Sequence, residues 1–338
     1  MRTIILQEPG RFVYADQPAD VVLQPGEALV KVGRIGICGT DLHAFRGRQP
    51  FFTYPRILGH ELGVEVVETA GPAGGLQAGD RCAVEPYLNC GACIACRRGK
   101  PNCCTTLRVL GVHTDGGMRE FLVVPAAKLH TSASLSLEQL ALVETLGIGA
   151  HAVDRAAPTP DDTVLVVGAG PIGLAVTQFA QRTGAAVAVV DQNAARLDFC
   201  RRQMGVQHTL PAGEDLIPSL TATFGGDLPT VVFDATGNAA AMRRALDYAA
   251  PGGRVVYVGL FQGDVTFPDP LFHRKELTLL ASRNATPGDF TGIIRHMEAG
   301  LLNTTPWITH RVPFGEMVAA FPGWLDPASG VIKAMVEV

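Results

Sequence analysis

The sequence predicts an α/β protein, with a doubly wound parallel sheet joined to a second, mainly β domain. From about His151 to about Asn284, strand-like and helical stretches alternate, which is typical of a parallel sheet with helices on both faces. Residues 1 to about 148 instead hold short strand-like runs between turn signals, as in a partly closed antiparallel fold. A length of 338 residues also suits two domains.

The expected elements follow from apolar runs bounded by turn residues. The first half contains strands at Arg2–Leu6, Ala28–Ile35, Gly63–Ala70, Arg81–Val84 and Glu120–Pro125. The second half contains strands at Thr163–Val167, Ala186–Val190, Thr230–Asp234 and Arg254–Gly259, with helices at Pro171–Thr183 and Ala194–Met204. The block after about Asn284 is expected to be loop-rich, and to end in a strand at Val331–Val338.

Composition excludes several classes of partner. The net charge of −4 shows no basic bias, so we expect no nucleic-acid partner. The N-terminus lacks the long apolar stretch of a signal peptide. The long apolar run Val164–Ala180 is broken by glycines and a proline, so we expect no membrane span. Free thiols in a chain without an export signal favour a reducing, cytoplasmic location.

Four cysteines stand at the spacing C-x2-C-x2-C-x7-C among small, polar and basic residues. Four thiolates this close in sequence can converge on one tetrahedral zinc ion, and a site filled by four thiolates is structural, since no position is left open. A disulfide staple is the alternative, although such staples belong to short secreted chains. Cys103 does not fit the register and is expected to be a packed neutral thiol. The predicted ligands are Cys90, Cys93, Cys96 and Cys104.

A glycine-rich stretch, Gly168-Ala169-Gly170-Pro171-Ile172-Gly173, follows a strongly apolar strand and opens a helix. An acid, Asp191, ends the next strand, which completes the dinucleotide fingerprint. Gly168 allows the tight turn, Gly170 lets the backbone approach the pyrophosphate, and Gly173 allows close packing of helix and strand. A glycine turn without a ligand is the alternative.

Asp191 also predicts the choice of cofactor. Its carboxylate can accept hydrogen bonds from both ribose hydroxyls and would repel a 2′-phosphate. Gln192 and Asn193 follow it, so no cation is adjacent in sequence, and NAD is favoured over NADP. Arg196 is expected to cover the adenine ribose, or else to be a solvated helix charge.

A second group of metal-ligand types contains Cys38 in GICGTDLH and His60-Glu61 in GHE. Together with the four-cysteine cluster, GAGPIG and Asp234-Ala235-Thr236-Gly237, these motifs resemble the zinc-containing medium-chain alcohol dehydrogenases over essentially the whole chain. Val143-Glu144 occupies the place where polyol and threonine dehydrogenases have a carboxylate. The stretches GRQPFFTYPRILGHE, GVHTDGG and SRNATPGDF look most like bacterial sugar-acid dehydrogenases of the L-galactonate 5-dehydrogenase type.

The resemblance implies a GroES-like catalytic domain at 1–149 and 286–338, with a zinc lobe at about 86–108, and a Rossmann NAD-binding domain at 150–285. It also implies two zinc ions per subunit, one catalytic and one structural. One departure concerns the glycine that the family carries three residues after the Glu of GHE. Here Val64 takes that place and Gly63 precedes it, which puts the local backbone path in question.

The resemblance further implies oxidation of a secondary alcohol to the ketone, by hydride transfer from a zinc-bound alkoxide to NAD. Cys38 and His60 would bind the catalytic zinc, with Glu61 as third ligand or exchanged for water. Glu144 would ligate directly or hold a water at the metal. Thr40 and His43 would relay the alcohol proton, although His43 could be a capping or packed residue. Asp41 is expected to bond backbone near the turn.

Around the nicotinamide, the family would use two short spans whose backbone groups face the carboxamide. Ordinary strand ends are the alternative interpretation of both spans. They are Val258-Gly259-Leu260 and Ser282-Arg283-Asn284, and Arg283 would reach phosphate or substrate.

A sugar acid needs a cation for its carboxylate and hydrogen-bond partners for its hydroxyls. The candidates for these contacts are Arg46, Arg48, Arg108, His113 and Arg283, with Phe51, Phe52 and Tyr54 as possible pocket walls or core.

Three functions stay open at this stage: a dehydrogenase of a polyhydroxylated acid or polyol such as sorbitol, an L-threonine 3-dehydrogenase-like enzyme, and a nucleotide-binding protein without catalysis. Intact Cys38, His60, Glu61 and Glu144 disfavour the last. Glu276–Ala281 is expected to be an edge strand that pairs with a second subunit in a homodimer or homotetramer.

Overall fold

The structure, a computed structural model, describes residues 1–18, 21–49, 52–214 and 216–338, so Phe51 lies outside the described residues. These residues form two compact units. The first unit contains Met1–Glu144 and Thr286–Val338, and the second contains Thr145–Ala285. Across the described ranges, no helix combines the length and the apolar composition that crossing a membrane requires.

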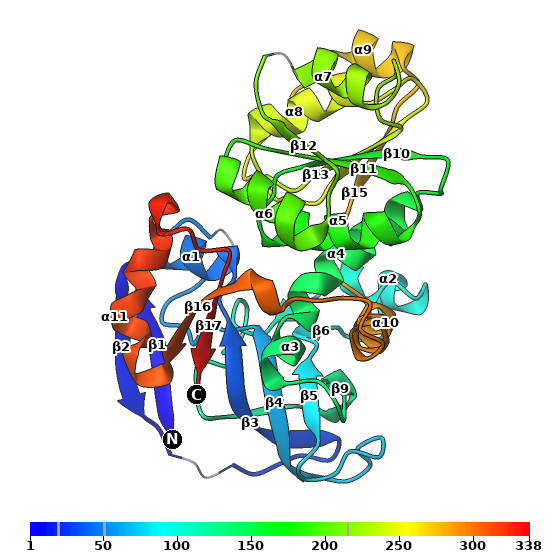
Figure 1. Cartoon of the computed structure of the whole chain (residues 1–338). Helices are drawn as coiled ribbons and strands as arrows, with labels where there is room; N and C mark the ends of the chain where they lie inside the picture. The colour runs from blue at the N-terminus through cyan, green and yellow to red at the C-terminus, as the bar shows by residue number, and fades with distance from the viewer. Residues whose placement is uncertain (19–20, 50–51, 215) are drawn as a thin grey trace. The chain divides into compact units, whose positions relative to one another are not determined.

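The second unit contains a parallel sheet of six strands in the order β12-β11-β10-β13-β14-β15. Helices α5 and α6 lie on one face of this sheet, and α8 and α9 lie on the other (Figure 1). The strands are β10 (Thr163–Val167), β11 (Ala186–Asp191), β12 (His208–Pro211), β13 (Val231–Asp234), β14 (Arg254–Tyr257) and β15 (Thr278–Ala281). The helices are α4 (Val143–Ala156, which begins in the first unit), α5 (Pro171–Arg182), α6 (Ala194–Met204), α7 (Leu216–Thr223), α8 (Ala239–Tyr248) and α9 (Asp269–Arg274).

Local chemistry explains these boundaries. The central strand β10 is apolar on both faces, since Val164, Leu165 and Val166 are all fully buried. Asn193 caps α6 by accepting hydrogen bonds from the first-turn amides, and α6 ends at Gly205 in the left-handed conformation. The strand order reverses between β10 and β13, and the crevice at such a switch point is where α/β sheets bind ligands.

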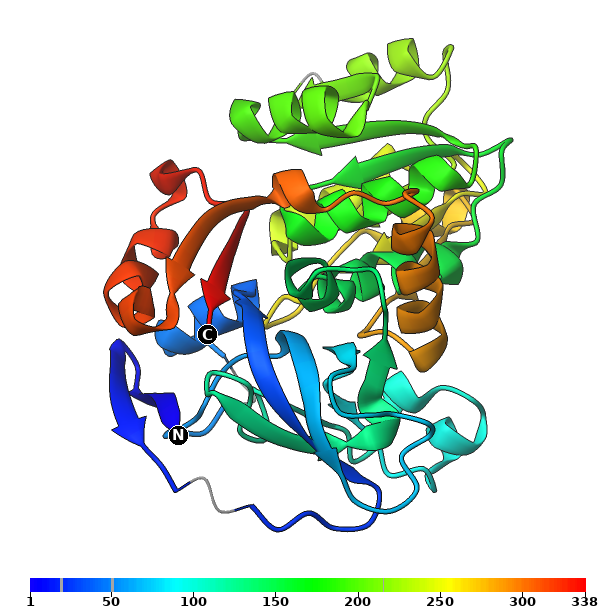
Figure 2. The same ribbon diagram turned by 60° about the horizontal axis from the view of Figure 1, so that its bottom comes forward.

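The first unit is built on a seven-stranded sheet of order β16-β17-β3-β4-β5-β9, with β8 paired to β3. Strands β3 and β4 run side by side in both views (Figure 1, Figure 2). Two further pairs of strands, β1 with β2 and β6 with β7, form separate two-stranded sheets. The strands of the first unit are β1 (Arg2–Glu8), β2 (Arg11–Asp16), β3 (Glu27–Gly36), β4 (Glu61–Thr69), β5 (Arg81–Val84), β6 (Tyr87–Leu88), β7 (Arg108–Val109), β8 (Phe121–Pro125), β9 (Leu129–Thr131), β16 (Ile308–Pro313) and β17 (Lys333–Glu337). Its helices are α1 (Gly39–Phe45), α2 (Ile94–Arg97), α3 (Leu137–Ala141), α10 (Pro287–Glu298) and α11 (Met317–Ala320), with 3-10 turns at Pro101–Cys103, Ala126–Lys128, Thr305–Trp307, Phe314–Glu316, Phe321–Leu325 and Pro327–Ser329.

The expectation of a loop-rich block after Asn284 is wrong, because helix α10 and strand β16 lie within it. The helix has readable signals. Thr286 and Asp289 form a capping box around Pro287, and the buried residues recur with helical spacing. That apolar face consists of Phe290, Ile293, Ile294 and Met297.

The glycine that departs from the family pattern has a packing role. Gly63 lies inside β4, next to a shift in the β3–β4 register: Val64 pairs with Val32, but Gly63 pairs with Arg34. A Cβ atom at Gly63 would lie 2.0 Å from the carbonyl oxygen of Leu137, at the start of α3. The missing side chain therefore lets α3 lie directly against the sheet.

We predict that Gly63→Ala lowers the free energy of unfolding by about 2–3 kcal/mol, because backbone atoms must shift to admit the methyl group. Gly292 is the matched control. It lies inside α10, and a Cβ there meets nothing within 4 Å. Gly292→Ala should raise the free energy of unfolding by about 0.5–1 kcal/mol. Urea unfolding of both variants measures the difference, and equal effects would contradict the packing argument.

Candidate metal and nucleotide sites

The four predicted cysteines converge in a lobe between β6 and β7. The Sγ atoms of Cys90, Cys93, Cys96 and Cys104 all lie within 4.8 Å of one another. The Sγ atoms of Cys93 and Cys96 are 3.6 Å apart, close to the roughly 3.8 Å that tetrahedral zinc with bonds of about 2.3 Å imposes. Backbone amides of Cys90 and Cys93 also point at sulfur atoms of the cluster, each at 3.3 Å. The geometry and the donor set fit zinc.

The state of the thiols agrees with a metal site. Hydrogen bonds from the backbone around Cys96 and Thr105 lower the pKa of Cys93 to about 5, which favours the thiolate that binds metal. All eight cysteines are free, which excludes the disulfide alternative in this structure. Cys103 is outside the cluster, as expected, but it is exposed rather than packed.

The second cluster joins Cys38, His60 and Glu61, whose ligand atoms also lie within 4.8 Å of one another. Strand pairing brings them together, because Cys38 follows β3, His60 precedes β4, and Gly36 of β3 pairs with Glu61 of β4. A Cβ at Gly36 would lie 2.2 Å from Glu61 Oε2, so the absence of a side chain there makes room for the carboxylate. Thiol, imidazole and carboxylate are a donor set that zinc accepts.

Sequence reasoning missed the partner of Glu61. Lys333 of β17 donates to both carboxylate oxygens of Glu61, at 2.6 and 2.7 Å, and both side chains are buried. Burial alone would lower the pKa of Lys333, but the charge of Glu61 outweighs it and raises that pKa. The ammonium therefore stays charged and compensates the buried carboxylate. The available signal was a lysine directly before the apolar run Ala334–Val336 of the terminal strand.

Glu144 lies in the first turn of α4 and is buried, with His60 and Glu61 as electrostatic neighbours. It does not belong to the group of ligand atoms that converge within 4.8 Å. Burial raises the pKa of Glu144, which accepts a hydrogen bond from the Tyr87 hydroxyl at 2.5 Å. Tyr87 is a second residue that sequence reasoning missed.

Helix α1 places the other residues of GICGTDLH. Asp41 accepts from the backbone N–H of Cys38 at 2.9 Å, as expected, and its second oxygen lies 3.8 Å from His60 Nδ1. Burial lowers the pKa of His60, but the charges of Cys38 and Asp41 outweigh it and raise that pKa. Thr40 is half-buried and His43 is exposed, and their spacing of three residues puts them on one side of α1.

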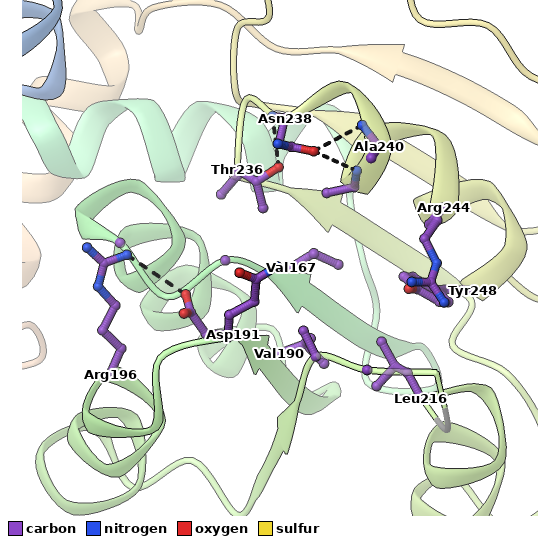
Figure 3. A pocket seen from close by; sticks show the side chains of 17 residues that line it. Val167, Val190, Asp191, Arg196, Leu216, Thr236, Asn238, Ala240, Arg244 and Tyr248 are labelled. Atoms are coloured by element: carbon purple, nitrogen blue, oxygen red, sulfur yellow. Dashed lines mark hydrogen bonds and ion pairs between the residues drawn. The ribbon is translucent and has the colours of Figure 1, made fainter. Parts of the chain in front are cut away.

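A cavity of about 390 Å³ lies beyond the carboxyl ends of β10, β11 and β13. Figure 3 shows Arg196 pointing toward Asp191, with 4.0 Å between Nη1 and Oδ2. Asp191 also accepts from the backbone amides of Ala169 and Asn193, at 2.6 and 2.7 Å. The cavity is lined by Gly168, Gly170, Asp191 and Arg196 of the predicted set, and by Thr236 of the Asp234–Gly237 motif. Its lining also includes Asn238, Arg244 and Tyr248, which sequence reasoning did not identify.

The glycines of the turn have different constraints. Gly168 has φ +98°, which favours glycine, and a Cβ at Gly173 would lie 1.7 Å from the Gly168 carbonyl oxygen. A Cβ at Gly170, in contrast, has one neighbour, Arg196 Nη1 at 3.8 Å. The protein alone therefore leaves room at Gly170, at the N-terminus of α5, where a pyrophosphate binds best. Ile172 is the second residue of α5, after Pro171.

The predicted nicotinamide residues follow β14 and β15 at the same edge of the sheet, but they do not line this cavity. The backbone amides of Val258 and Gly259 donate to the Asp234 carbonyl at 2.9 and 3.0 Å. The backbone amide of Ser282 donates to Tyr257. Leu260 and Arg283 are exposed, and Asn284 has a left-handed backbone.

The candidate substrate residues have different surroundings. Arg46 donates to the carbonyl of Leu325 at 2.7 Å, and His113 Nδ1 accepts from the backbone amide of Val109 at 3.1 Å. Arg108 lies in β7 at the base of the cysteine lobe, and Arg48 is exposed. Phe52 and Tyr54 pack against the core of the first unit, with their ring centroids 5.5 Å apart.

Comparisons with known proteins agree with this geometry. Residues 24–134 match the alcohol dehydrogenase GroES-like domain, and residues 171–299 match the zinc-binding dehydrogenase model. The chain is 43% identical to L-galactonate-5-dehydrogenase of Escherichia coli (strain K12), over 95% of this chain and 94% of the relative. It is 35% identical to L-threonine 3-dehydrogenase of Pyrococcus horikoshii, over 85% and 84%. A short chain alcohol dehydrogenase of E. coli CFT073, complexed with NADH, superposes with a TM-score of 0.91 at 30% identity, over 100% and 99%.

We predict that Gly170→Ala leaves the melting temperature unchanged and weakens dinucleotide binding about tenfold or more, because its methyl group meets a ligand rather than the protein. Gly173→Ala is the control, and it should lower the melting temperature, since its methyl group meets the Gly168 carbonyl. Calorimetric titration with NADH and thermal unfolding separate the two. Normal NADH binding by Gly170→Ala would contradict the assignment.

The two metal clusters should respond differently to single substitutions. Cys93→Ser should lower stability, and with it assembly, because it removes a ligand from a site that ties down a lobe. Cys38→Ser should abolish turnover while the melting temperature stays close to that of the unaltered protein. Metal analysis should find two zinc ions in the unaltered chain and one in Cys38→Ser. One zinc per unaltered chain would contradict the two-site assignment.

Proposed function

Because the chain belongs to the zinc-binding alcohol dehydrogenase family, we propose that it oxidises a secondary alcohol of a sugar acid or polyol to the ketone, with NAD as hydride acceptor. The observation that carries the proposal is the Cys38–His60–Glu61 cluster in a chain that also has a dinucleotide cavity. A four-cysteine site has no open position for a substrate oxygen, but a cluster of three ligands does.

The substrate class follows from the relatives. The 43% identity to an L-galactonate-5-dehydrogenase over nearly the whole chain favours a sugar acid such as L-galactonate. The second candidate is L-threonine, because an L-threonine 3-dehydrogenase is 35% identical. That substrate would need an anionic partner for its ammonium group as well as a cation for its carboxylate.

In this proposal Cys38 and His60 hold the catalytic zinc, and Glu61 is the third ligand. Zinc supplies a Lewis acid that polarises the alcohol oxygen and makes its proton easier to remove. Lys333 compensates the charge of the Glu61 carboxylate, so this carboxylate attracts a bound cation less strongly. Glu144 ligates the metal directly or holds a water at the metal. Thr40 and His43 move the alcohol proton along α1 toward solvent.

The cofactor residues divide between binding and orientation. The α5 N-terminus at Gly170 holds the pyrophosphate, and Asp191 with Arg196 holds the adenine ribose. The spans 258–260 and 282–284 orient the nicotinamide. The assignment of 150–285 as the NAD-binding domain, and of 1–149 with 286–338 as the catalytic domain, is part of the same proposal.

Assembly and location complete the proposal. Strand β15 is an edge of the parallel sheet, and we assign it to pairing with a second subunit in a homodimer or homotetramer. Eight free cysteines, with four of them gathered for a metal, support a reducing, cytoplasmic location.

A substrate screen tests the function. NADH formation with L-galactonate, L-gulonate, sorbitol and L-threonine should be highest with L-galactonate, and NADP should support much less turnover because Asp191 repels a 2′-phosphate. Cys38→Ser is the inactive control. A fully metal-loaded protein that oxidises none of the four compounds would refute the proposal for these substrates, and preference for L-threonine would select the second candidate.

A further inference from the structure

Tyr87 contacts Glu144 in a setting shielded from water. Its hydroxyl donates to Glu144 Oε1 at 2.5 Å, and the two residues are only 3% and 6% exposed. A hydrogen bond to a buried carboxylate is among the stronger ones in proteins. Because Oε1 is committed to Tyr87, the carboxylate is fixed in one rotation, with Oε2 left for another partner.

The segment that carries Tyr87 is clamped by one ammonium group. Lys128 Nζ contacts Glu85 Oε1, and it also donates to Asn89 Oδ1 at 2.9 Å. Glu85 precedes Tyr87 by two residues, and Asn89 follows it by two. Glu85 is 1% exposed and is also bonded to His130 Nε2 at 3.1 Å. The clamp therefore restrains the backbone on both sides of Tyr87.

The same segment forms the base of the cysteine lobe. Tyr87 pairs with Val109, and Leu88 pairs with Arg108, so the β6–β7 ladder closes the loop that contains the four cysteines. The Asn89 side chain donates to Cys96 Sγ at 3.7 Å. The contacts that close the lobe therefore also fix strand β6, which carries Tyr87.

Aromatic contacts orient the ring itself. The Tyr87 ring meets Phe290 of α10 edge-on, with 6.3 Å between centroids. Phe290 is stacked on the other side against His130, at 5.0 Å, and His130 belongs to the clamp through Glu85. Ring and backbone are therefore held by one connected set of contacts.

We propose that Tyr87 is a positioning residue for Glu144, and that the Lys128 clamp and the four-cysteine lobe hold Tyr87 in place. The inference rests on the proposed function, since it assigns a task to the carboxylate beside the Cys38–His60 cluster. In this proposal the four-cysteine lobe affects the reaction through Tyr87, and the lobe itself does not contact the substrate.

The substitution Tyr87→Phe removes the hydroxyl and keeps the ring. We expect kcat to fall about tenfold or more, the KM for NAD to stay unchanged, and the visible spectrum of protein with Co²⁺ at the Cys38–His60 cluster to shift. Tyr14→Phe is the control. It removes a hydroxyl that donates to the Gly315 carbonyl at 2.7 Å, and it should change neither kcat nor the Co²⁺ spectrum. Lys128→Met should change kcat and the Co²⁺ spectrum in the same direction as Tyr87→Phe.

A double-mutant cycle identifies the partner. If Tyr87 acts through Glu144, then adding Tyr87→Phe to Glu144→Gln should change kcat less than twofold. An equal loss in both backgrounds, or an unaltered spectrum in Tyr87→Phe, would overturn the proposal. If Tyr87→Phe does not fold, an unaltered spectrum in folded Lys128→Met overturns it instead. The Co²⁺ spectrum needs no substrate, so a failed substrate screen would refute the proposed function without deciding this test.

Discussion

Strand β3 is the constraint on which the first unit depends. It pairs with β17, β4 and β8, and its last residues lead directly to Cys38. Pairing with β4 brings Glu61 opposite Gly36, and pairing with β17 brings the C-terminal segment, including Lys333, to the same end of the sheet. Three segments far apart in the chain thus meet at one strand end. The metal cluster is a product of strand register, and a slip of one residue would turn its side chains to the opposite face.

The buried carboxylates at this strand end each have a hydrogen-bond donor. Glu61 is compensated by Lys333, Glu144 accepts from Tyr87, and Asp41 accepts from a backbone amide beside Cys38. Each carboxylate therefore has a partner before any cation arrives, which limits the desolvation cost of keeping so many acids buried. A site built in this way holds its shape through local hydrogen bonds.

The sequence carries the local parts of this design and not the distant ones. The fingerprint from Gly168 to Gly173 and the four-cysteine spacing are readable, because each is specified by residues within one turn or one loop. The Lys333–Glu61 pair spans 272 positions and the Tyr87–Glu144 bond spans 57, so no local pattern announces either. Helix α10 is a different case. Its capping box and apolar spacing were readable, but the surrounding proline and threonine residues favoured an assignment to loop.

Gly63 sets the position of Glu144 from a distance. It faces the carbonyl oxygen of Leu137, a backbone atom, so α3 rests at a depth that one methyl group would change. Helix α3 ends at Ala141, and after Leu142 helix α4 begins, with Glu144 in its first turn. The absence of a side chain at this glycine therefore determines how close to the sheet the Glu144 carboxylate lies. Natural variation at Gly63 should be read as a change in the geometry of the candidate site around Glu144.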